Sequence, residues 1–108
     1  MKTLYAACLS RLGLSQSEAA ALHGVGLQSV KNWCAGRSAV PDGLWADLRG
    51  YEQRIVDRSE ALREAWEDAG EVRDVDVKVN GDPTNLMAAA DFLLSTDADL
   101  PVSVRVID

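Results

Sequence analysis

Two side-chain amides, at Gln28 and Asn32, lie four residues apart and would share one face of a helix. Each amide carries a hydrogen-bond donor and an acceptor, and both can make paired hydrogen bonds to the edge of an adenine base. Lys31, on the next row of this helix, could contact a guanine or a phosphate, and Ser29 could contact either. For an isolated helix, the default alternative is a solvated polar face that binds nothing.

The helix that must carry these side chains is predicted from Leu27 to Cys34. Its opposite face holds Val30 and Trp33, and branched and aromatic side chains at three-residue spacing are typical of a protein core. The segment 35–37, Ala-Gly-Arg, ends the helix, because glycine is the usual residue just past a helix C-terminus. The pattern therefore predicts a helix with one buried face and one polar face.

Another short helix is predicted just before it, from Gln16 to His23. Ser15 can serve as its N-cap, and Glu18, three residues on, would complete a capping box. The segment 24–26, Gly-Val-Gly, is too flexible to continue a helix and suits a sharp turn. We expect His23 to be a partly buried side chain with its hydrogen bonds satisfied, since a metal-linked or pH-linked role would need partners and the chain has no second histidine.

The stretch from Leu14 to Arg37 resembles the helix-turn-helix of the Cro/C1-type (XRE, lambda-repressor-like) family of regulators. The positions that carry the resemblance cover about a quarter of the chain: Leu14, Ser15, Gln16, Glu18, Gly24, Val25, Val30, Trp33, Gly36, Arg37 and Pro41. His23 departs from the pattern, because the family usually has an aliphatic residue there. In such motifs the second helix lies in the DNA major groove and the first crosses the backbone.

This resemblance implies a role for each polar position of the two helices. It favours base contacts over a solvated face for four residues of the second helix: Gln28, Ser29, Lys31 and Asn32. It implies contacts with the DNA backbone for Ser15, Gln16, Leu27 and Arg37. Gln16 would face a phosphate from a helix N-terminus, although an ordinary surface glutamine is an equally good interpretation of this residue.

The charges of the chain are unevenly distributed. Residues 1–41 contain four Lys and Arg against Glu18 alone, a net charge of +3, whereas residues 42–108 contain seven against sixteen Asp and Glu, a net charge of −9. The segment expected to contact DNA is therefore basic, as attraction to phosphates requires. The acidic remainder would weaken non-specific binding to nucleic acid.

Enzyme chemistry finds little support in this sequence. It contains one histidine, no paired carboxylates with a cleft signature, no nucleophile elbow and no glycine-rich phosphate loop after a strand. Asp74, Asp76 and Asp82 lie near a turn but lack the spacing of a calcium loop. We therefore expect a protein that is not an enzyme, with no catalytic residues, no metal and no cofactor.

The cysteines and the hydropathy indicate a cytoplasmic protein. Cys8 and Cys34 lie in predicted helices and form no metal-type cluster, so free thiols are the simpler interpretation, with Cys8 as a small core residue. No apolar run is long enough to span a bilayer, and the apolar stretch at the N-terminus is interrupted by Ser10 and Arg11, unlike a signal peptide.

Helices are also predicted on both sides of the pair. One runs from about Thr3 to Leu12, with an apolar face of Leu4, Tyr5, Cys8, Leu9 and Leu12. Another follows Pro41, from Asp42 to Ala69, and its apolar positions are Leu44, Leu48, Tyr51, Ile55, Leu62 and Trp66, with Arg58 in the one polar slot. This stripe could cover the helix pair or contact a second copy of the chain. Gly50 leaves open whether the segment is one helix or two.

The last third of the sequence has the pattern strand, helix, strand. Valines alternate with polar residues at 75–79 and again at 102–106, and between them a helix is predicted over 85–95, with Thr84 as its cap. Two strands alone make a marginal sheet, so we expect pairing with the same strands of a second chain. The residues assigned to this dimerisation are Val77, Val79, Val102, Val104 and Val106.

Together these patterns predict a mainly α fold with a small C-terminal β-α-β part: a helix-turn-helix domain with its long following helix at 1–70, and a dimerisation part at 71–108. The function expected is a homodimeric transcriptional regulator, most simply an autorepressor, that binds an inverted repeat in double-stranded DNA. The layout is similar to small phage or mobile-element repressors, including the anti-CRISPR-associated (Aca) type. The alternative is an antitoxin whose acidic C-terminal half binds a protein toxin. RNA binding stays open, although every aromatic residue has a core assignment.

Overall fold

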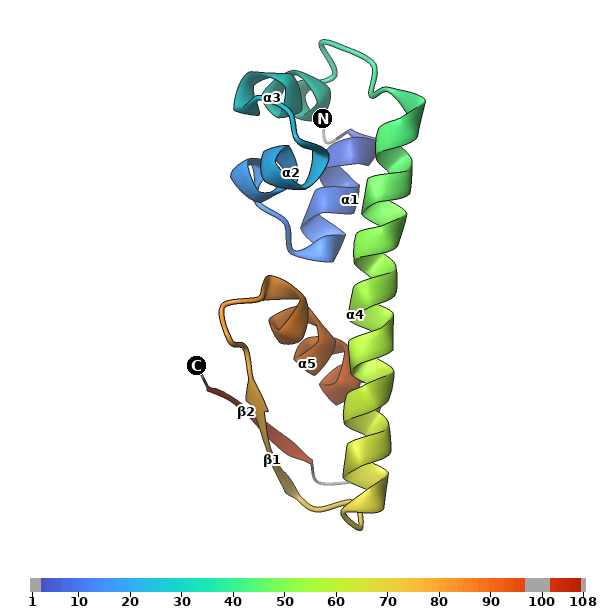
Figure 1. The fold of residues 1–108 in the computed structure, drawn as a ribbon, viewed down its shortest axis with the longest axis vertical. Coiled ribbons are helices and arrows are strands. Elements are labelled where there is room, and N and C mark those ends of the chain that lie inside the picture. The colour runs from blue at the N-terminus through green and yellow to red at the C-terminus, as the bar shows by residue number, and fades with distance from the viewer. Residues whose placement is uncertain (1–2, 97–101, 108) are drawn as a thin grey trace. The chain divides into compact units, whose positions relative to one another are not determined.

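A computed structural model describes residues 3–96 and 102–107 of the chain (Figure 1). These residues form five helices and two strands, which divide into two compact units, Met1–Glu52 and Gln53–Asp108. The mainly helical fold with a small sheet is confirmed. None of the helices in the described part of the chain has both the length and the apolar character that crossing a membrane requires.

The first unit contains α1 (Leu4–Leu12), α2 (Gln16–His23), α3 (Leu27–Ala35) and the beginning of α4 (Asp42–Asp68). Local chemistry sets the first boundaries as predicted. The hydroxyl of Thr3 accepts a hydrogen bond from the Ala6 amide at 3.1 Å and starts α1. Gly13 ends α1 in the left-handed conformation, with φ at 70°.

The core of the first unit is an aromatic cluster around Tyr5. The Tyr5 ring meets Trp33 of α3 edge-on at 5.7 Å between ring centroids, and Trp45 of α4 at 5.9 Å. Apolar side chains surround this cluster: Leu9, Leu12, Leu14, Ala19, Ala20, Val30 and Leu48. Leu4 was expected in this core but is 74% exposed, because α1 turns the face of Tyr5 and Leu9 inward instead.

The segment after Pro41, for which Gly50 had left open one helix or two, forms a single continuous helix of 27 residues, α4. Nothing lies within 4 Å of the position that a Cβ atom at residue 50 would occupy. The glycine is therefore not needed to let another part of the chain pack closely against the helix. The helix therefore absorbs the cost of roughly 1 kcal/mol that glycine brings to a helix interior. The two compact units divide within α4, after Glu52.

The second unit contains the rest of α4, then β1 (Asp74–Lys78), α5 (Pro83–Ser95) and β2 (Ser103–Ile107). The strands pair in parallel, with Asp74 beside Ser103 and Lys78 beside Ile107, and α5 is the crossover between them (Figure 1). On the exposed face of the sheet, the Arg105 guanidinium bonds both carboxylate oxygens of Asp76 at 3.0 Å.

The N-terminus of α5 differs from the prediction. The helix begins at Pro83, and its cap is Asp82, not Thr84. Both the amide and the hydroxyl of Thr84 donate to Asp82, at 3.0 and 2.7 Å. The hydroxyl bond is the main reason that the pKa of Asp82 lies below its ordinary value, and Arg58, 2.5 Å away, also lowers it. Proline suits the first helical position because it needs no N–H partner there.

The core of the second unit forms around Phe92, which is fully buried and meets the Trp66 ring edge-on at 5.6 Å. Val77, Ala88 and Ala89 complete it. Three leucines of α5 are exposed: Leu86 (46%), Leu93 (40%) and Leu94 (83%). The reason is that the bulk of Phe92 and the small alanines fit the space beside α4 and the sheet, and they set the rotation of α5.

The Trp33→Ala substitution tests the core assignment of the first unit. Trp33 is 8% exposed, and removing a buried tryptophan side chain should lower the free energy of unfolding by roughly 3–5 kcal/mol. Urea unfolding followed by far-UV circular dichroism measures the change. Trp45→Ala is the control, since Trp45 is only half-buried and its removal should cost less. An unchanged unfolding midpoint for Trp33→Ala would contradict the assignment.

Candidate nucleic-acid interface

Three residues join α2 to α3. Gly24 takes the left-handed conformation, with φ at 69°, and the amide of the next residue, Val25, donates back to the Ala20 carbonyl at 3.0 Å. Gly26 follows as the N-cap of α3. The turn brings α3 against α1 and α2, where Val30 is completely buried and Trp33 nearly so. Two short helices joined by a three-residue turn are thus present at the predicted positions.

The outer face of α3 holds the two amides predicted to lie together. Gln28 Nε2 donates a hydrogen bond to Asn32 Oδ1 at 3.1 Å, on the exposed side of the helix. This bond leaves the Gln28 carbonyl oxygen and the Asn32 amino group to face outward, an acceptor beside a donor. Lys31 is exposed next to them, and Ser29 is half-buried. Of the four residues assigned to base contacts, Gln28 and Lys31 are thus exposed, and Asn32 and Ser29 are half-buried.

The N-termini of α2 and α3 differ in how their N–H groups are used. In α2 the predicted capping box is present: the Glu18 amide donates to Ser15 Oγ, and the Ser15 amide donates to Glu18 Oε1, both at 3.0 Å. The backbone N–H of Ser15 is therefore taken by a carboxylate, so Ser15 could reach a phosphate only through its hydroxyl hydrogen. Gln16 follows and is exposed.

The N-terminus of α3 has no side-chain cap, because Gly26 stands at the cap position. Leu27, the first residue of the helix, is 39% exposed. Free N–H groups at the positive end of a helix suit an anion. The backbone of Leu27 is consequently better placed for a phosphate than that of Ser15.

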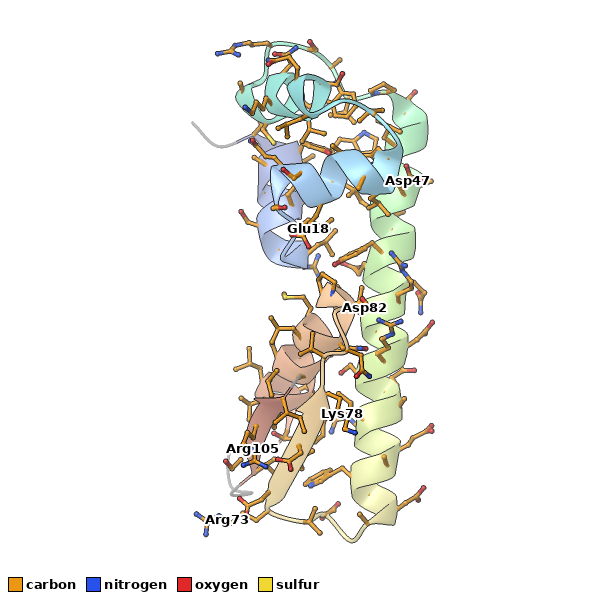
Figure 2. The ribbon with its side chains drawn as sticks, turned by 60° about the vertical axis from the view of Figure 1, so that its left-hand side comes forward. Glu18, Asp47, Arg73, Lys78, Asp82 and Arg105 are labelled. Atoms are coloured by element: carbon orange, nitrogen blue, oxygen red, sulfur yellow. The ribbon has the colours of Figure 1, made fainter. Side chains whose placement is uncertain are left out.

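Two basic side chains accompany α3: Lys31 lies within the helix, and Arg37 directly follows its C-cap, Gly36. Lys31 and Arg37 are exposed, and neither has an acidic partner among residues 3–96 and 102–107. Arg11 of the same unit differs in having an acidic partner, because its guanidinium lies 3.4 Å from the carboxylate of Glu52. Glu18 is the one acidic residue within α2 and α3 themselves, and Figure 2 shows it at the start of α2. The surface of α3 therefore keeps the positive charge that the sequence indicated.

A buried histidine holds the helix pair on the rest of the unit. The His23 side chain is 0% exposed, its Nδ1 lies 2.9 Å from Asp47 Oδ2, and its Nε2 lies 3.0 Å from the Tyr5 hydroxyl. A carboxylate can only accept, so Nδ1 carries the proton, and a neutral ring then accepts from Tyr5 at Nε2. Figure 2 shows Asp47 on α4, on the side of the helix pair.

The sequence indicated a satisfied histidine but missed both of its partners. Asp47 lies 24 residues away along the chain, and no spacing rule connects two such positions. The sequence position of Asp47 could have indicated that it has a partner. Asp47 directly precedes Leu48, within the apolar stripe of α4, where an acidic residue needs a partner. Burial in this network raises the pKa of Tyr5 to about 12, and the nearby Cys34 adds to the effect.

The valines assigned to dimerisation are not equivalent in the structure. Val77 is 5% exposed, so its side chain belongs to the core of its own chain and cannot form a surface for another. Val79 and Val102 lie just outside the strands and are half-buried, as is Val104 within β2. Val106 alone of the five is exposed, at 42%.

The described residues contain no group of three or more His, Cys, Asp or Glu side chains that could hold a metal ion. Both cysteines are free thiols and half-buried. Comparisons with protein-family models, with curated proteins and with solved structures find no match to this chain. The interpretation of the α3 surface therefore depends on its own chemistry.

The raised pKa of Tyr5 predicts how stability changes in alkali. An unfolded tyrosine ionises near pH 10, whereas folded Tyr5 keeps its proton to about pH 12. The contribution of the protonated Tyr5 hydroxyl to the free energy of unfolding is therefore complete below pH 10, and it is lost as the pH rises from 10 to 12. Urea unfolding across this range should show a steeper fall for the wild type than for Tyr5→Phe, which has no proton to lose at this position. Parallel curves would contradict the assignment.

Proposed function

We propose that this chain is a sequence-specific DNA-binding regulator that places α3 in the major groove and acts as a twofold homodimer on an inverted repeat. The observation that carries the proposal is the paired amides of Gln28 and Asn32 on the open face of α3. Their outward donor and acceptor match the adenine edge, and the same helix is anchored from behind by Val30 and Trp33. Autorepression by occupying its own promoter is the simplest form of this activity.

The electrostatics of the surface support the same function. The α3 face combines an uncapped helix N-terminus with exposed Lys31 and Arg37, while acidic residues are concentrated after residue 41. Basic groups around a readout helix hold the phosphates and fix the register, whereas the amides select the base pairs. An acidic remainder limits binding elsewhere on DNA, which leaves discrimination to the contacts of α3.

The antitoxin alternative is less favoured. A neutralising segment often orders only on its toxin, yet residues 53–96 and 102–107 form a unit with a core of their own around Phe92 and Trp66. RNA binding is also less favoured, because the large rings near α3 are held inside the unit: Tyr5 and Trp33 are buried and Trp45 is half-buried.

The direct experiment measures binding of the purified chain to the DNA upstream of its own gene. A scrambled duplex of equal length and composition is the comparison, and the salt concentration is varied for both. Tight binding to the upstream DNA alone, with a twofold-symmetric footprint, would support the proposal. Equal binding to both duplexes at every salt concentration would overturn autorepression through this DNA. A selection from a randomised library then tests sequence-specific binding itself, and failure to enrich any preferred duplex would overturn the proposal.

Gln28→Ala tests base readout. The substitution should weaken binding to the selected duplex by about 1–3 kcal/mol and relax the preference at particular base pairs, because one amide contact is lost. Gln53→Ala is a matched control: Gln53 is also an exposed helical glutamine, bonded to Asp57 four residues on at 2.8 Å, but it lies on α4. An equal loss on every sequence for Gln28→Ala would reject base readout by this residue.

Arg37→Ala tests a backbone contact. Removing one phosphate contact should weaken binding to specific and scrambled duplexes by a similar factor, and should reduce the slope of log K against log salt by about 1. The measurement is a salt titration of both duplexes with wild type and variant. A change in base preference without a change in slope would instead assign Arg37 to readout.

A further inference from the structure

Within its own unit, the described residues leave an apolar face of α5 exposed. Its inner face, with Thr84, Ala88, Ala89 and Phe92, is at most 2% exposed. Its outer face presents three leucines: Leu86 (46% exposed), Leu93 (40%) and Leu94 (83%), with exposed Ala90 between them. Contiguous exposed apolar surface can mark an interaction site, so this row is a candidate for one.

Charge is almost absent from this helix. Asp91 is the one charged residue in α5, although 26% of the chain is charged. The carboxylate of Asp91 is engaged within the unit, where it accepts a hydrogen bond from the Ser59 hydroxyl at 2.5 Å. The row of Leu86, Ala90 and Leu94 itself carries no charge, so two such rows can meet without bringing like charges together.

The spacing of the row is symmetric about its centre. Leu86 and Leu94 each lie four residues from Ala90, so the row has a large, a small and a large side chain at equal steps. A twofold axis requires a surface that complements itself. Two antiparallel copies of α5 crossing at Ala90 satisfy this requirement, because Leu86 would meet the partner's Leu94 and the two small alanines would let the helices approach closely.

We propose that the outer face of α5 binds the same face of a second copy of this chain, antiparallel, with the twofold axis at Ala90. The inference rests on the proposed function for its expectation of a dimer, but it moves the centre of the interface from the strand valines to α5. Val106 supports the assignment: it pairs in register with buried Val77, so it lies on the α5 side of the sheet, yet it is 42% exposed.

The experiment is sedimentation equilibrium of the full chain without DNA, with far-UV circular dichroism to check the fold. The wild type should sediment as a dimer. Leu86→Glu and Leu94→Lys, made singly, should each weaken dimerisation by about 100-fold, because each buries a charge against a leucine. Each charge suits its end of the helix dipole, so the fold of the monomer should persist. Leu4→Lys is the matched control, since Leu4 is 74% exposed but lies on α1.

Combining Leu86→Glu with Leu94→Lys tests the antiparallel register. Opposite charges would then face each other across the axis, and dimerisation should recover. A monomeric wild type, or single variants that dimerise as the wild type does, would overturn the proposal. Single variants that are monomeric without recovery in the double variant would overturn the register. Binding to DNA is measured separately with Gln28→Ala, so a chain that dimerises through α5 but shows no DNA preference would refute the proposed function alone.

Discussion

The first unit depends on one buried ring, that of His23. An imidazole closed off from water must have a partner at each nitrogen, because an unsatisfied buried group costs about 1–3 kcal/mol. Tyr5 from α1 and Asp47 from α4 meet this demand, so the three helices can pack together only in the arrangement that satisfies the ring. The position of α3 follows, since Trp33 lies edge-on to both Tyr5 and His23. A polar link in the core thereby fixes where the amides on the surface stand.

The parts of the fold that depend on neighbouring residues were predictable from the sequence. Thr3, Ser15 and Glu18 cap helices through bonds to amides within three residues, and such short-range chemistry leaves a clear pattern. The contact between Gln28 and Asn32 was predictable for the same reason, because positions four apart on a helix always lie side by side. The functional interpretation of this face needed the family resemblance as well, and it stays a prediction.

Features set by distant residues were not predictable. In α5 nearly every position from Leu86 to Leu94 is apolar, so periodicity could not choose the buried face. Phe92 made the choice, by filling the space beside Trp66. The partners of His23 come from two other helices, and the continuity of α4 through Gly50 depends on packing that outweighs a weak local preference. The outer leucines of α5 and the valines of the strands could be assigned only once this packing was known.

The parallel pairing of β1 and β2 also has a consequence for the order of folding during synthesis. All the bonds around His23 and the edge-on ring contacts of Trp33 form within residues 1–52, so this unit can close as soon as the start of α4 has left the ribosome. The strand β1 must wait, because its partner β2 lies 29 residues further on and α5 separates them. A nascent chain therefore completes the surface of α3 before it has a sheet. Until β2 emerges, β1 lacks its strand partner, and an unpaired strand edge is open to aggregation.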